Sequence, residues 1–503
     1  MIRTFQTHRI RRQQELTESL WHFTALSGEN AGKSFPVATP SCWETYPGFE
    51  LYRGEGKYET TFCAGGDLRI ECKGVSHTAN VYLDGVLIRK HYNAYTPFSV
   101  LVKDVPKGEH TLSIVADNRF SPESALHIPN DYMSYGGVTR PVAVEEVNGC
   151  YLERIHITPV LENGRWRTHI EATVCNLRET RPVTLRVRIA GEEAALTKTL
   201  PEGESELALE LSFSDVKTWS PETPVLYTAE AMMHDLLQIK DLGANSVRTA
   251  HYPNDERFLD LCDELGILVW EENHARGLSL EQMQNPNFER QAEEVTREMV
   301  LNHYNHPSIY IWGILNECAS DSEYGKECYR AQFEIIRALD QTRPVSFASC
   351  KFKTDLCFDL PDVVSYNIYP QWYHDTPVKE YLNDLYSWVQ DETDGRGKPF
   401  LVTEIGAGGL YGYRTPYASK WSEEYQQKAL EEQLTDVLSH PACSGVYIWQ
   451  FSDIRISEEW WGTRPRTMNN KGVVDEYRRP KLCYETVKRI FERDRQIHET
   501  ARK

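Results

Sequence analysis

The second half of the chain alternates between two patterns of apolar residues. Short apolar runs rich in β-branched and aromatic residues predict buried strands, and longer stretches with apolar residues three or four positions apart predict helices. In order, we expect helix 231–242, strand 245–251, helix 255–265, strand 267–273, helix 287–305, strand 309–317, helix 321–340, strand 344–350, strand 363–370, helix 378–392, strand 399–406, helix 424–439, strand 444–452 and helix 480–493. This alternation is typical of a parallel sheet covered by helices. Seven strands in a series that begins with a helix predict a (β/α)8 TIM-type barrel that lacks its first strand.

Two of the expected strands end in a glutamate. The run that starts at Ile309 is apolar until Asn316 and Glu317, and the run that starts at Pro399 is mostly apolar until Glu404. In TIM barrels the carboxyl ends of the strands carry the active site. Two carboxylates that face each other across a pocket are the pair that glycoside hydrolysis needs. For Asn316 and Glu317 the alternative is an ordinary solvated turn.

The first half of the chain shows the alternating sequence pattern of an all-β structure. Residues 1–146 contain short alternating runs, and Asp84-Gly85 between two of them indicates a tight hairpin. These features favour a jelly-roll β-sandwich. Residues 147–228 alternate in the same way, and their length and strand spacing suit an immunoglobulin-like β-sandwich. The barrel then takes up residues 229–503.

Composition excludes several classes of partner. The 503 residues carry a formal net charge of −19, which argues against nucleic acid or an anionic membrane. The 12 cysteines contain no Cys-x-x-Cys pair and no zinc-like cluster, so we expect reduced thiols, no metal, and a cytoplasmic location. The basic N-terminal residues are followed by no apolar run, so we expect neither a signal peptide nor a membrane span.

Several motifs, in order along the chain, resemble one known family. They are Trp43-Glu44, Tyr52-Arg-Gly54 and Val81-Tyr-Leu-Asp-Gly85 in the first sandwich, Trp219-Ser-Pro-Glu-Thr-Pro-Val-Leu-Tyr227 at the end of the second, and Val247-Arg-Thr-Ala-His-Tyr-Pro253, His306 through Glu317 and Val402-Thr-Glu-Ile-Gly406 in the barrel. Nearly the whole chain resembles glycoside hydrolase family 2, the β-galactosidase/β-glucuronidase family, and most of all its bacterial β-glucuronidase branch. The resemblance implies a cofactor-free retaining β-glycosidase that acts on small-molecule glucuronides and forms a homo-oligomer.

The resemblance also assigns the reacting groups. Glu317 is expected to be the general acid/base and Glu404 the nucleophile, with Asn316 bound to the sugar 2-hydroxyl. This agrees with the chemistry, because one carboxyl must be protonated to assist the leaving oxygen while the other is ionised to attack the anomeric carbon.

Further residues are expected around this pair. His251 lies at a strand end and is expected to line the sugar site; by itself a strand-end histidine is more often structural. Tyr369 is expected to bond the nucleophile, with Tyr373 beside it. Trp449 ends the last strand and could stack under the sugar, although aromatic residues in barrel strands are more often core. Asp131 lies in a loop that would otherwise be read as a structural turn, and the resemblance places it against sugar hydroxyls.

The choice of sugar depends on the loop after the last strand. β-Glucuronidases carry Asn-x-Lys there, and Asn469 and Lys471 fit this spacing. An ammonium and an amide donor suit a carboxylate, with Arg464 and Arg466 as further positive groups. Because some family β-galactosidases carry similar runs, a β-galactosidase or a β-galacturonidase is the alternative.

The chain departs from the family near residues 228–232. The family resemblance implies a linker strand and the first barrel strand before the first barrel helix, so about 50–60 residues are missing, roughly one barrel unit. An open seam exposes unpaired strand edges. One alternative is therefore a catalytically impaired carbohydrate-binding protein. Another is that residues 226–235 serve as a surrogate strand.

Overall fold

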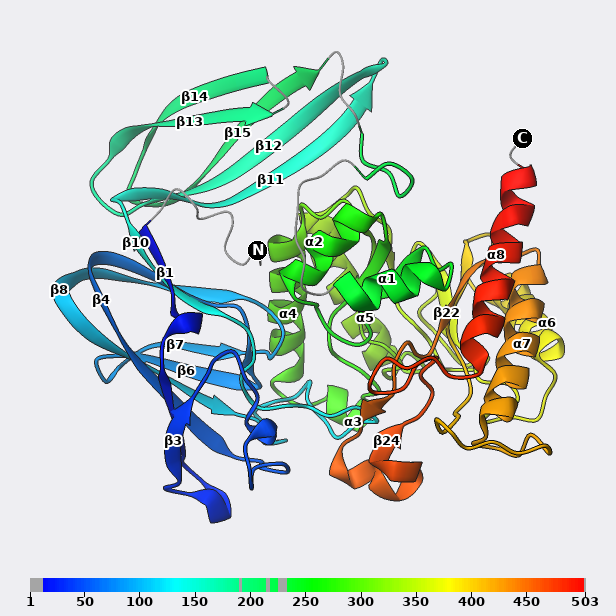
Figure 1. Ribbon diagram of the computed structural model, residues 1–503. Helices are drawn as coiled ribbons and strands as arrows, with labels where there is room; N and C mark the ends of the chain where they lie inside the picture. The colour runs from blue at the N-terminus through cyan, green and yellow to red at the C-terminus, as the bar shows by residue number, and fades with distance from the viewer. Residues whose placement is uncertain (1–11, 190–191, 214–217, 225–232, 502–503) are drawn as a thin grey trace.

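The computed structural model describes residues 12–189, 192–213, 218–224 and 233–501 (Figure 1). A β-rich unit, a second β-rich unit and a helix-rich unit follow one another along the chain. The second unit lies at the top of the view in Figure 1, above the other two. The predicted deletion near residues 228–232 and most of the segment 226–235 fall outside the described residues.

The first unit is built around one large antiparallel sheet. Its strands are ordered β1-β10-β4-β8-β6-β7, with β2 pairing both β3 and β4, and a separate small sheet pairs β5 with β9. The bounds are β1 (Arg12–Glu15), β2 (Trp21–Ala25), β3 (Ser34–Val37), β4 (Glu55–Cys72), β5 (Val75–Ser76), β6 (Thr78–Leu83), β7 (Val86–Tyr92), β8 (Phe98–Asp117), β9 (Gly137–Val138) and β10 (Val142–Val147), with short 3-10 helices η2 (Leu16–Glu18), η3 (Gly28–Asn30) and η4 (Trp43–Thr45).

Local sequence explains the pairing in this sheet. Residues of β6 alternate between buried and partly exposed, as the period of a half-buried strand requires. Asp84 and Gly85 both have positive φ, of 49° and 79°, and form the tight turn between β6 and β7. This is the backbone that a two-residue hairpin needs, so the hairpin predicted from Asp-Gly is present. The sheet buries an aromatic core that includes Trp21 and Trp43.

The second unit is entirely antiparallel. It contains β11 (Cys150–Glu162), β12 (Arg165–Asn176), β13 (Arg181–Ile189), β14 (Glu192–Leu200) and β15 (Gly203–Phe213). Strands β11, β12 and β15 form one sheet, and β13 and β14 form a hairpin. Small apolar clusters, one around Ile170 and Leu211 with Val187 of the hairpin, pack the two layers together.

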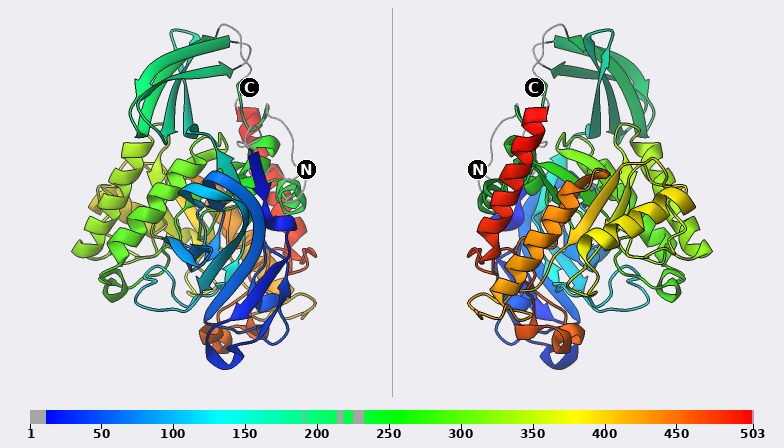
Figure 2. Two further views of the ribbon diagram at one scale, coloured as in Figure 1. Left: turned by 90° about the vertical axis from the view of Figure 1, so that its left-hand side faces the viewer. Right: turned by 90° about the vertical axis from the view of Figure 1, so that its right-hand side faces the viewer.

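The third unit carries the alternating helices and parallel strands. It contains α1 (Met233–Asp241), β16 (Ser246–Arg248), α2 (Glu256–Leu265), β17 (Leu268–Glu272), α3 (Leu280–Met283), α4 (Phe288–His303), β18 (Ile309–Gly313), α5 (Glu323–Leu339), β19 (Val345–Ser346), β20 (Val364–Asn367), α6 (Val378–Glu392), β21 (Phe400–Ile405), α7 (Glu423–Ser439), β22 (Cys443–Ile448), β23 (Ile454–Arg455), η5 (Glu458–Thr463), η6 (Pro465–Thr467), β24 (Met468–Asn469) and α8 (Cys483–Ala501). The helices cover the outside of the strands (Figure 2).

The parallel strands form two arcs. One arc has the order β16-β17-β18-β19 and the other β20-β21-β22. A single parallel bridge between Ser349 and Tyr366 joins them beyond the end of β19. On the other side, β16 and β22 share no ladder among the described residues, although the Ser246 and Tyr447 hydroxyls lie 2.7 Å apart. A cavity of about 650 Å³, lined by residues of β16, β22, α1 and α8, occupies this seam.

Two elements differ from the sequence prediction in a way that matters for the site. Strand β18 ends at Gly313, not at residue 317, because Leu315 and Glu317 have positive φ of 44° and 56°. The chain therefore turns sharply before Glu317. Strand β16 likewise ends at Arg248, three residues before His251. Both side chains are held in the turns just beyond the strand ends.

A long loop of the first unit reaches into the third. Residues 118–136 connect β8 to β9. The Ala125 amide donates to Gln291 of α4 at 2.9 Å, and the Ser457 amide donates to the Asn130 carbonyl at 3.2 Å. These bonds bring the loop to the carboxyl ends of the barrel strands.

Candidate active site

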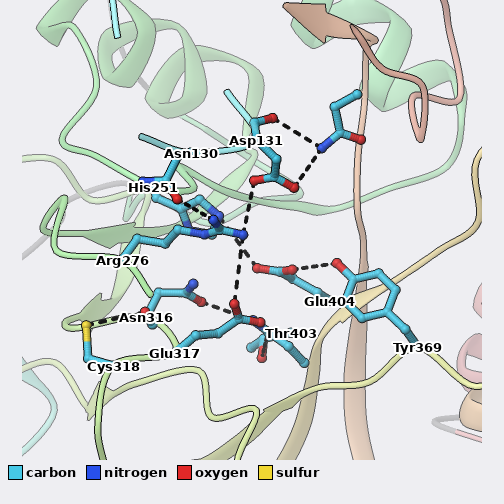
Figure 3. Close-up of polar contacts among 12 residues, drawn as sticks. Asn130, Asp131, His251, Arg276, Asn316, Glu317, Cys318, Tyr369, Thr403 and Glu404 are labelled. Atoms are coloured by element: carbon cyan, nitrogen blue, oxygen red, sulfur yellow. Dashed lines mark hydrogen bonds and ion pairs between the residues drawn. The ribbon is translucent and has the colours of Figure 1, made fainter. Parts of the chain in front are cut away.

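The carboxyl ends of the barrel strands surround a pocket of about 210 Å³. Acidic, cationic and aromatic side chains line it together, which is typical of a site that binds a polar ring. The lining residues are Asp131, Arg276, Glu317, Cys350, Asn367, Tyr369, Tyr373, His374, Tyr381, Glu404, Trp449, Trp460, Arg464 and Lys471. Figure 3 shows the polar contacts among several of them.

Glu404 lies on β21 and is 3% exposed. One carboxylate oxygen accepts a hydrogen bond from Arg248 at 2.9 Å, and the other accepts one from the Tyr369 hydroxyl at 2.5 Å. Burial and the charge of Glu404 raise the pKa of Tyr369 well above its ordinary value. This hydroxyl therefore stays protonated and acts as the hydrogen-bond donor to Glu404.

Arg248 connects the strand ends beneath the pocket. Its guanidinium pairs with Glu272 at 2.8 Å, with Glu404 at 2.9 Å, and donates to the Asn316 side-chain oxygen at 2.6 Å. Burial opposes its charge, but Glu272 and Glu404 outweigh burial and raise its pKa. Arg248 thereby fixes the nucleophile candidate and orients the Asn316 amide. The Asn316 side-chain nitrogen has no hydrogen-bond partner among the described residues; Asn316 is buried and lies behind the residues that line the pocket.

Glu317 is more open than Glu404. Its side chain is 18% exposed, and one oxygen accepts a hydrogen bond from Asn367 at 2.9 Å. The nearest cation is Arg276, whose nitrogen lies 3.8 Å from the other oxygen. The two carboxyls thus have different surroundings: Glu404 has a direct cationic partner and a phenol, whereas Glu317 has an amide donor and access to solvent.

Asp131 comes from the loop of the first unit and is 4% exposed. Arg276, which follows β17, lies 3.1 Å from one carboxylate oxygen, and Asn469 donates to the other at 3.1 Å. Burial acts to raise the pKa of Asp131, but Arg276 and Lys471 outweigh it and lower the pKa. The buried aspartate is therefore charged, and Arg276 places one guanidinium between it and Glu317 (Figure 3).

A second cationic group lies on the side of the pocket formed by the loop after β22. The Lys471 ammonium donates to the Tyr373 hydroxyl at 2.8 Å and lies 4.5 Å from the centre of the Tyr369 ring. Arg464 donates to the same Tyr373 hydroxyl at 3.1 Å. Lys471 is 3% exposed, so its charge acts in a poorly solvated place. Two cations that converge on one hydroxyl are positioned to bind an anion.

His251 and Trp449 form the floor near the nucleophile candidate. Their rings stack with centres 4.8 Å apart. His251 is fully buried, and Glu272 holds one ring nitrogen at 2.9 Å. The other ring nitrogen lies 3.7 Å from Glu404. Trp449 lines the pocket, whereas His251 supports it from behind.

The structure does not bring every expected residue to the pocket. The Arg466 side chain is 51% exposed and pairs with Glu476 at 2.9 Å, away from the lining residues. The arginine of this loop that lines the pocket is Arg464, two residues earlier. Asn469 is buried, does not line the pocket, and donates to Asp131 at 3.1 Å.

Some lining residues were not identified from the sequence. Arg276, Asn367 and Trp460 line the pocket, and Arg248 supports it from below. Arg248 lies within the Val247–Pro253 motif, which was a usable signal. Arg276 follows the acidic end of β17, and only its position between two carboxylates in three dimensions marks it as part of the site.

Among the described residues, one group has ligand atoms close enough to hold a metal ion: Asp260, Asp263 and His306. It lies outside the residues that line the pocket. Asp263 accepts hydrogen bonds from the Ser308 amide at 2.9 Å and pairs with His306 at 2.7 Å. The group therefore already has a structural use.

Comparison with known proteins agrees with this geometry. The model "Glycosyl hydrolases family 2, TIM barrel domain" matches residues 220–494, more than half of the chain, and the model "Glycosyl hydrolases family 2" matches residues 150–241. The chain belongs to glycoside hydrolase family 2. This family-2 chain has the predicted fold class, with β-sandwiches followed by a TIM-type barrel.

A family-2 β-galacturonidase from Eisenbergiella tayi, solved bound to galacturonate, is 51% identical with a TM-score of 0.94, and the match covers 98% of this chain and 99% of that one. The β-glucuronidase of Mus musculus is 33% identical over 256 residues, which span 50% of this chain and 39% of the mouse protein. The β-glucuronidase of Streptococcus agalactiae is 25% identical over 511 residues, covering 80% of this chain and 84% of that protein.

In the part of the chain that the structure describes, no helix is both long and apolar enough to cross a membrane. The cytoplasmic location and the homo-oligomer stay predictions.

Proposed function

We propose that this protein is a retaining β-glycosidase that hydrolyses terminal β-D-uronides, with β-D-galacturonides as its preferred substrates. One observation carries the proposal. The pocket is lined by a pair of carboxyls, Glu317 and Glu404. It also contains two cations, Lys471 and Arg464, which both donate to the Tyr373 hydroxyl. The carboxyls suit glycoside cleavage, and the cations suit a sugar that carries a carboxylate.

In the first step, Glu404 attacks the anomeric carbon and Glu317 gives its proton to the departing glycosidic oxygen. Arg248 and Tyr369 each donate a hydrogen bond to one oxygen of Glu404 and fix both oxygens, so that the attacking lone pair needs little reorganisation. Glu317 has access to solvent, which lets it regain a proton between cycles. The products are a covalent glycosyl-enzyme and the free aglycone alcohol.

In the second step, Glu317 acts as a base. It removes a proton from a water molecule that attacks the anomeric carbon, and the bond to Glu404 breaks with retention of configuration. The Asn316 amide nitrogen has no partner among the described residues and is held by Arg248 through its oxygen. It is suited to bind the sugar 2-hydroxyl, a contact that strengthens as charge develops at the neighbouring carbon.

The uronate carboxylate is assigned to Lys471 and Arg464. An ammonium has three donors, and Tyr373 uses one of them in the described structure, which leaves donors for the sugar. Asp131, on the first-unit loop, and Arg276 are then suited to the ring hydroxyls. An anionic aspartate accepts hydrogen bonds from hydroxyls, while Arg276 donates to their oxygens.

The preference for galacturonide rests on the 51% identity with the E. tayi galacturonidase over nearly the full length. The curated relatives named β-glucuronidases support the second candidate, a β-glucuronidase. The two sugars differ only in the orientation of the 4-hydroxyl. The carboxylate-binding group serves both sugars, so the choice between them is assigned to the contacts with the ring hydroxyls, for which Asp131 and Arg276 are suited.

Hydrolysis of nitrophenyl β-D-galacturonide, β-D-glucuronide and β-D-galactoside tests the proposal. We expect kcat/KM to be highest for the galacturonide, and NMR to show a β-configured first product. Glu317→Gln and Glu404→Gln should each lower kcat by at least about 100-fold. Preference for the neutral galactoside contradicts the uronate assignment. Galacturonate binding without turnover of any of the three substrates indicates the catalytically impaired alternative.

A further inference from the structure

Two loops that supply sugar-facing residues meet at two places. The loop 118–136 carries Asn130 and Asp131, and the segment after β17 carries Arg276. Arg276 donates to Asn130 at 2.5 Å and lies 3.1 Å from Asp131 (Figure 3). The second meeting point involves His127 of the loop and His274 of the segment, whose ring centres lie 4.4 Å apart.

These histidines belong to a continuous buried stack. His77, from the chain between β5 and β6, lies against His127 with ring centres 3.8 Å apart and planes at 11°. Phe120 lies at 5.6 Å from the His77 ring and ends the stack on the other side. His77, His127 and His274 are 0%, 5% and 1% exposed. Three imidazoles from three separate segments are thus buried against one another, with His77 and His127 stacked and His274 tilted by 42° against His127.

The surroundings of the stack do not favour positive charge. The Tyr92 hydroxyl lies 2.9 Å from one nitrogen of His127, and the Tyr95 ring flanks His127 and His274. The cation Arg53, which itself pairs with Glu458 at 3.5 Å, opposes a positive charge on His77 and His127, whereas a backbone hydrogen bond at Arg119 favours one on His77. Both nitrogens of His274 and one of His127 have no hydrogen-bond partner among the described residues.

Burial therefore keeps the stack neutral. It lowers the pKa of His274 to about 3, and it lowers the pKa of His77 and of His127 well below the ordinary histidine value, with Arg53 and the neighbouring imidazoles acting in the same direction. A proton can bind these rings only when the stack opens, because an imidazolium inside it faces burial, another ring and a cation.

We propose that His77, His127 and His274 form an acid-sensitive latch that holds loop 118–136 on the barrel, so that protonation opens the latch and withdraws Asp131 from Arg276 and the sugar pocket. Opening of the latch is coupled to the sugar pocket through short stretches of backbone. His127 is four residues from Asp131, and His274 is two residues from Arg276, so the same two segments separate at both meeting points.

The expected steepness follows from proton linkage. Each imidazole that is neutral in the closed state and has an ordinary pKa of about 6.5 in the open state favours opening tenfold for each pH unit below that value. Two imidazoles give about 100-fold and three about 1,000-fold for each pH unit. The sign is fixed, since acid favours the open loop and neutral pH the closed one.

Hydrogen exchange of the full chain, followed by mass spectrometry between pH 7.5 and 5, tests the latch without any sugar. After correction for the intrinsic effect of pH on exchange, protection of peptides within 118–136 should fall by more than tenfold for each pH unit below the onset of opening. Peptides from β4 should keep their protection. Loop protection that stays constant down to pH 5 overturns the proposal.

Variants identify the groups responsible. His127→Phe/His274→Phe keeps aromatic packing but leaves His77 as the one latch ring that can bind a proton, so the loss of loop protection should shrink to about tenfold for each pH unit. If the double variant fails to fold, His127→Gln is the smaller change, because glutamine cannot bind a proton. It should reduce the fall in loop protection by about tenfold for each pH unit. His498→Gln, at an exposed position on α8, is the matched control and should behave as wild type. An acid response that is identical in wild type and in the folded His127 variants overturns the assignment.

Discussion

Replacing Lys471 by methionine removes the charge that the proposal assigns to the uronate carboxylate and keeps an unbranched apolar side chain that is one atom shorter. Lys471 is 3% exposed, and its ammonium lies 4.5 Å from the Tyr369 ring centre and 2.8 Å from the Tyr373 hydroxyl. A hydrogen bond to a charged group contributes about 1.5–3 kcal/mol, more where water is excluded. We therefore expect kcat/KM for nitrophenyl galacturonide to fall by about 10- to 150-fold.

The same change should not penalise a neutral sugar. The galactoside lacks the carboxylate, so its kcat/KM should stay within about threefold of wild type, since no charged contact is lost. Lys420→Met is the matched control, because Lys420 also lies 4.5 Å from an aromatic ring, that of Trp372, but does not line the pocket. It should leave both substrates unaffected. Equal losses for galacturonide and galactoside in Lys471→Met refute the carboxylate assignment.

Three further predictions concern the hydrogen bond to the nucleophile, the two arginines of the loop after β22, and the pH dependence of folding stability. Tyr369→Phe removes a 2.5 Å hydrogen bond to the nucleophile and should lower kcat about 10- to 100-fold with little change in folding. Arg464→Ala should raise KM for uronides at least about tenfold, whereas Arg466→Ala should change it less than twofold, because only Arg464 lines the pocket. The attraction of Asp263 outweighs burial and raises the pKa of His306 to about 9. The pair therefore contributes about 3 kcal/mol to the free energy of unfolding below about pH 6.5, and this contribution is lost as the pH rises through 9.

Each of these has its own check. Tyr369→Phe is followed by single-turnover kinetics, and an unchanged glycosylation rate contradicts its role. For the arginines, equal effects on KM contradict the placement of the loop. Urea unfolding of His306→Gln should show less loss of stability between pH 6 and 9.5 than wild type. A wild-type-like pH dependence in that variant contradicts the His306 assignment.

Much of the arrangement of the barrel could be predicted from local pattern. Buried strands are short and apolar, and helices show their own period, so the elements that carry Glu317 and Glu404 were located from the sequence. The exact place of Glu317 was not, since the strand ends at Gly313 and a turn with positive φ at Leu315 follows. Apolar residues around such a turn give no signal that the ladder has ended.

Contacts between distant segments could not be predicted from local pattern. Arg276 becomes part of the site only because loop 118–136 of another unit brings Asp131 against it. In the loop after β22, too, the local sequence did not predict which side chain faces the pocket. Arg466 has a φ of 57° within η6, and this backbone sends its side chain to Glu476 while Arg464 faces the pocket. A spacing of two residues in the sequence does not show which arginine faces inward.

The central claim is that Glu404 forms a covalent bond to a uronic sugar. Incubation with a 2-fluoro-β-D-galacturonyl fluoride, which slows hydrolysis of the glycosyl-enzyme, followed by peptide mass spectrometry tests it directly. The account predicts one fluorouronyl group per chain, attached to Glu404, with Glu404→Gln unlabelled. Attachment to Glu317, or no adduct while the enzyme turns over nitrophenyl galacturonide, would contradict it.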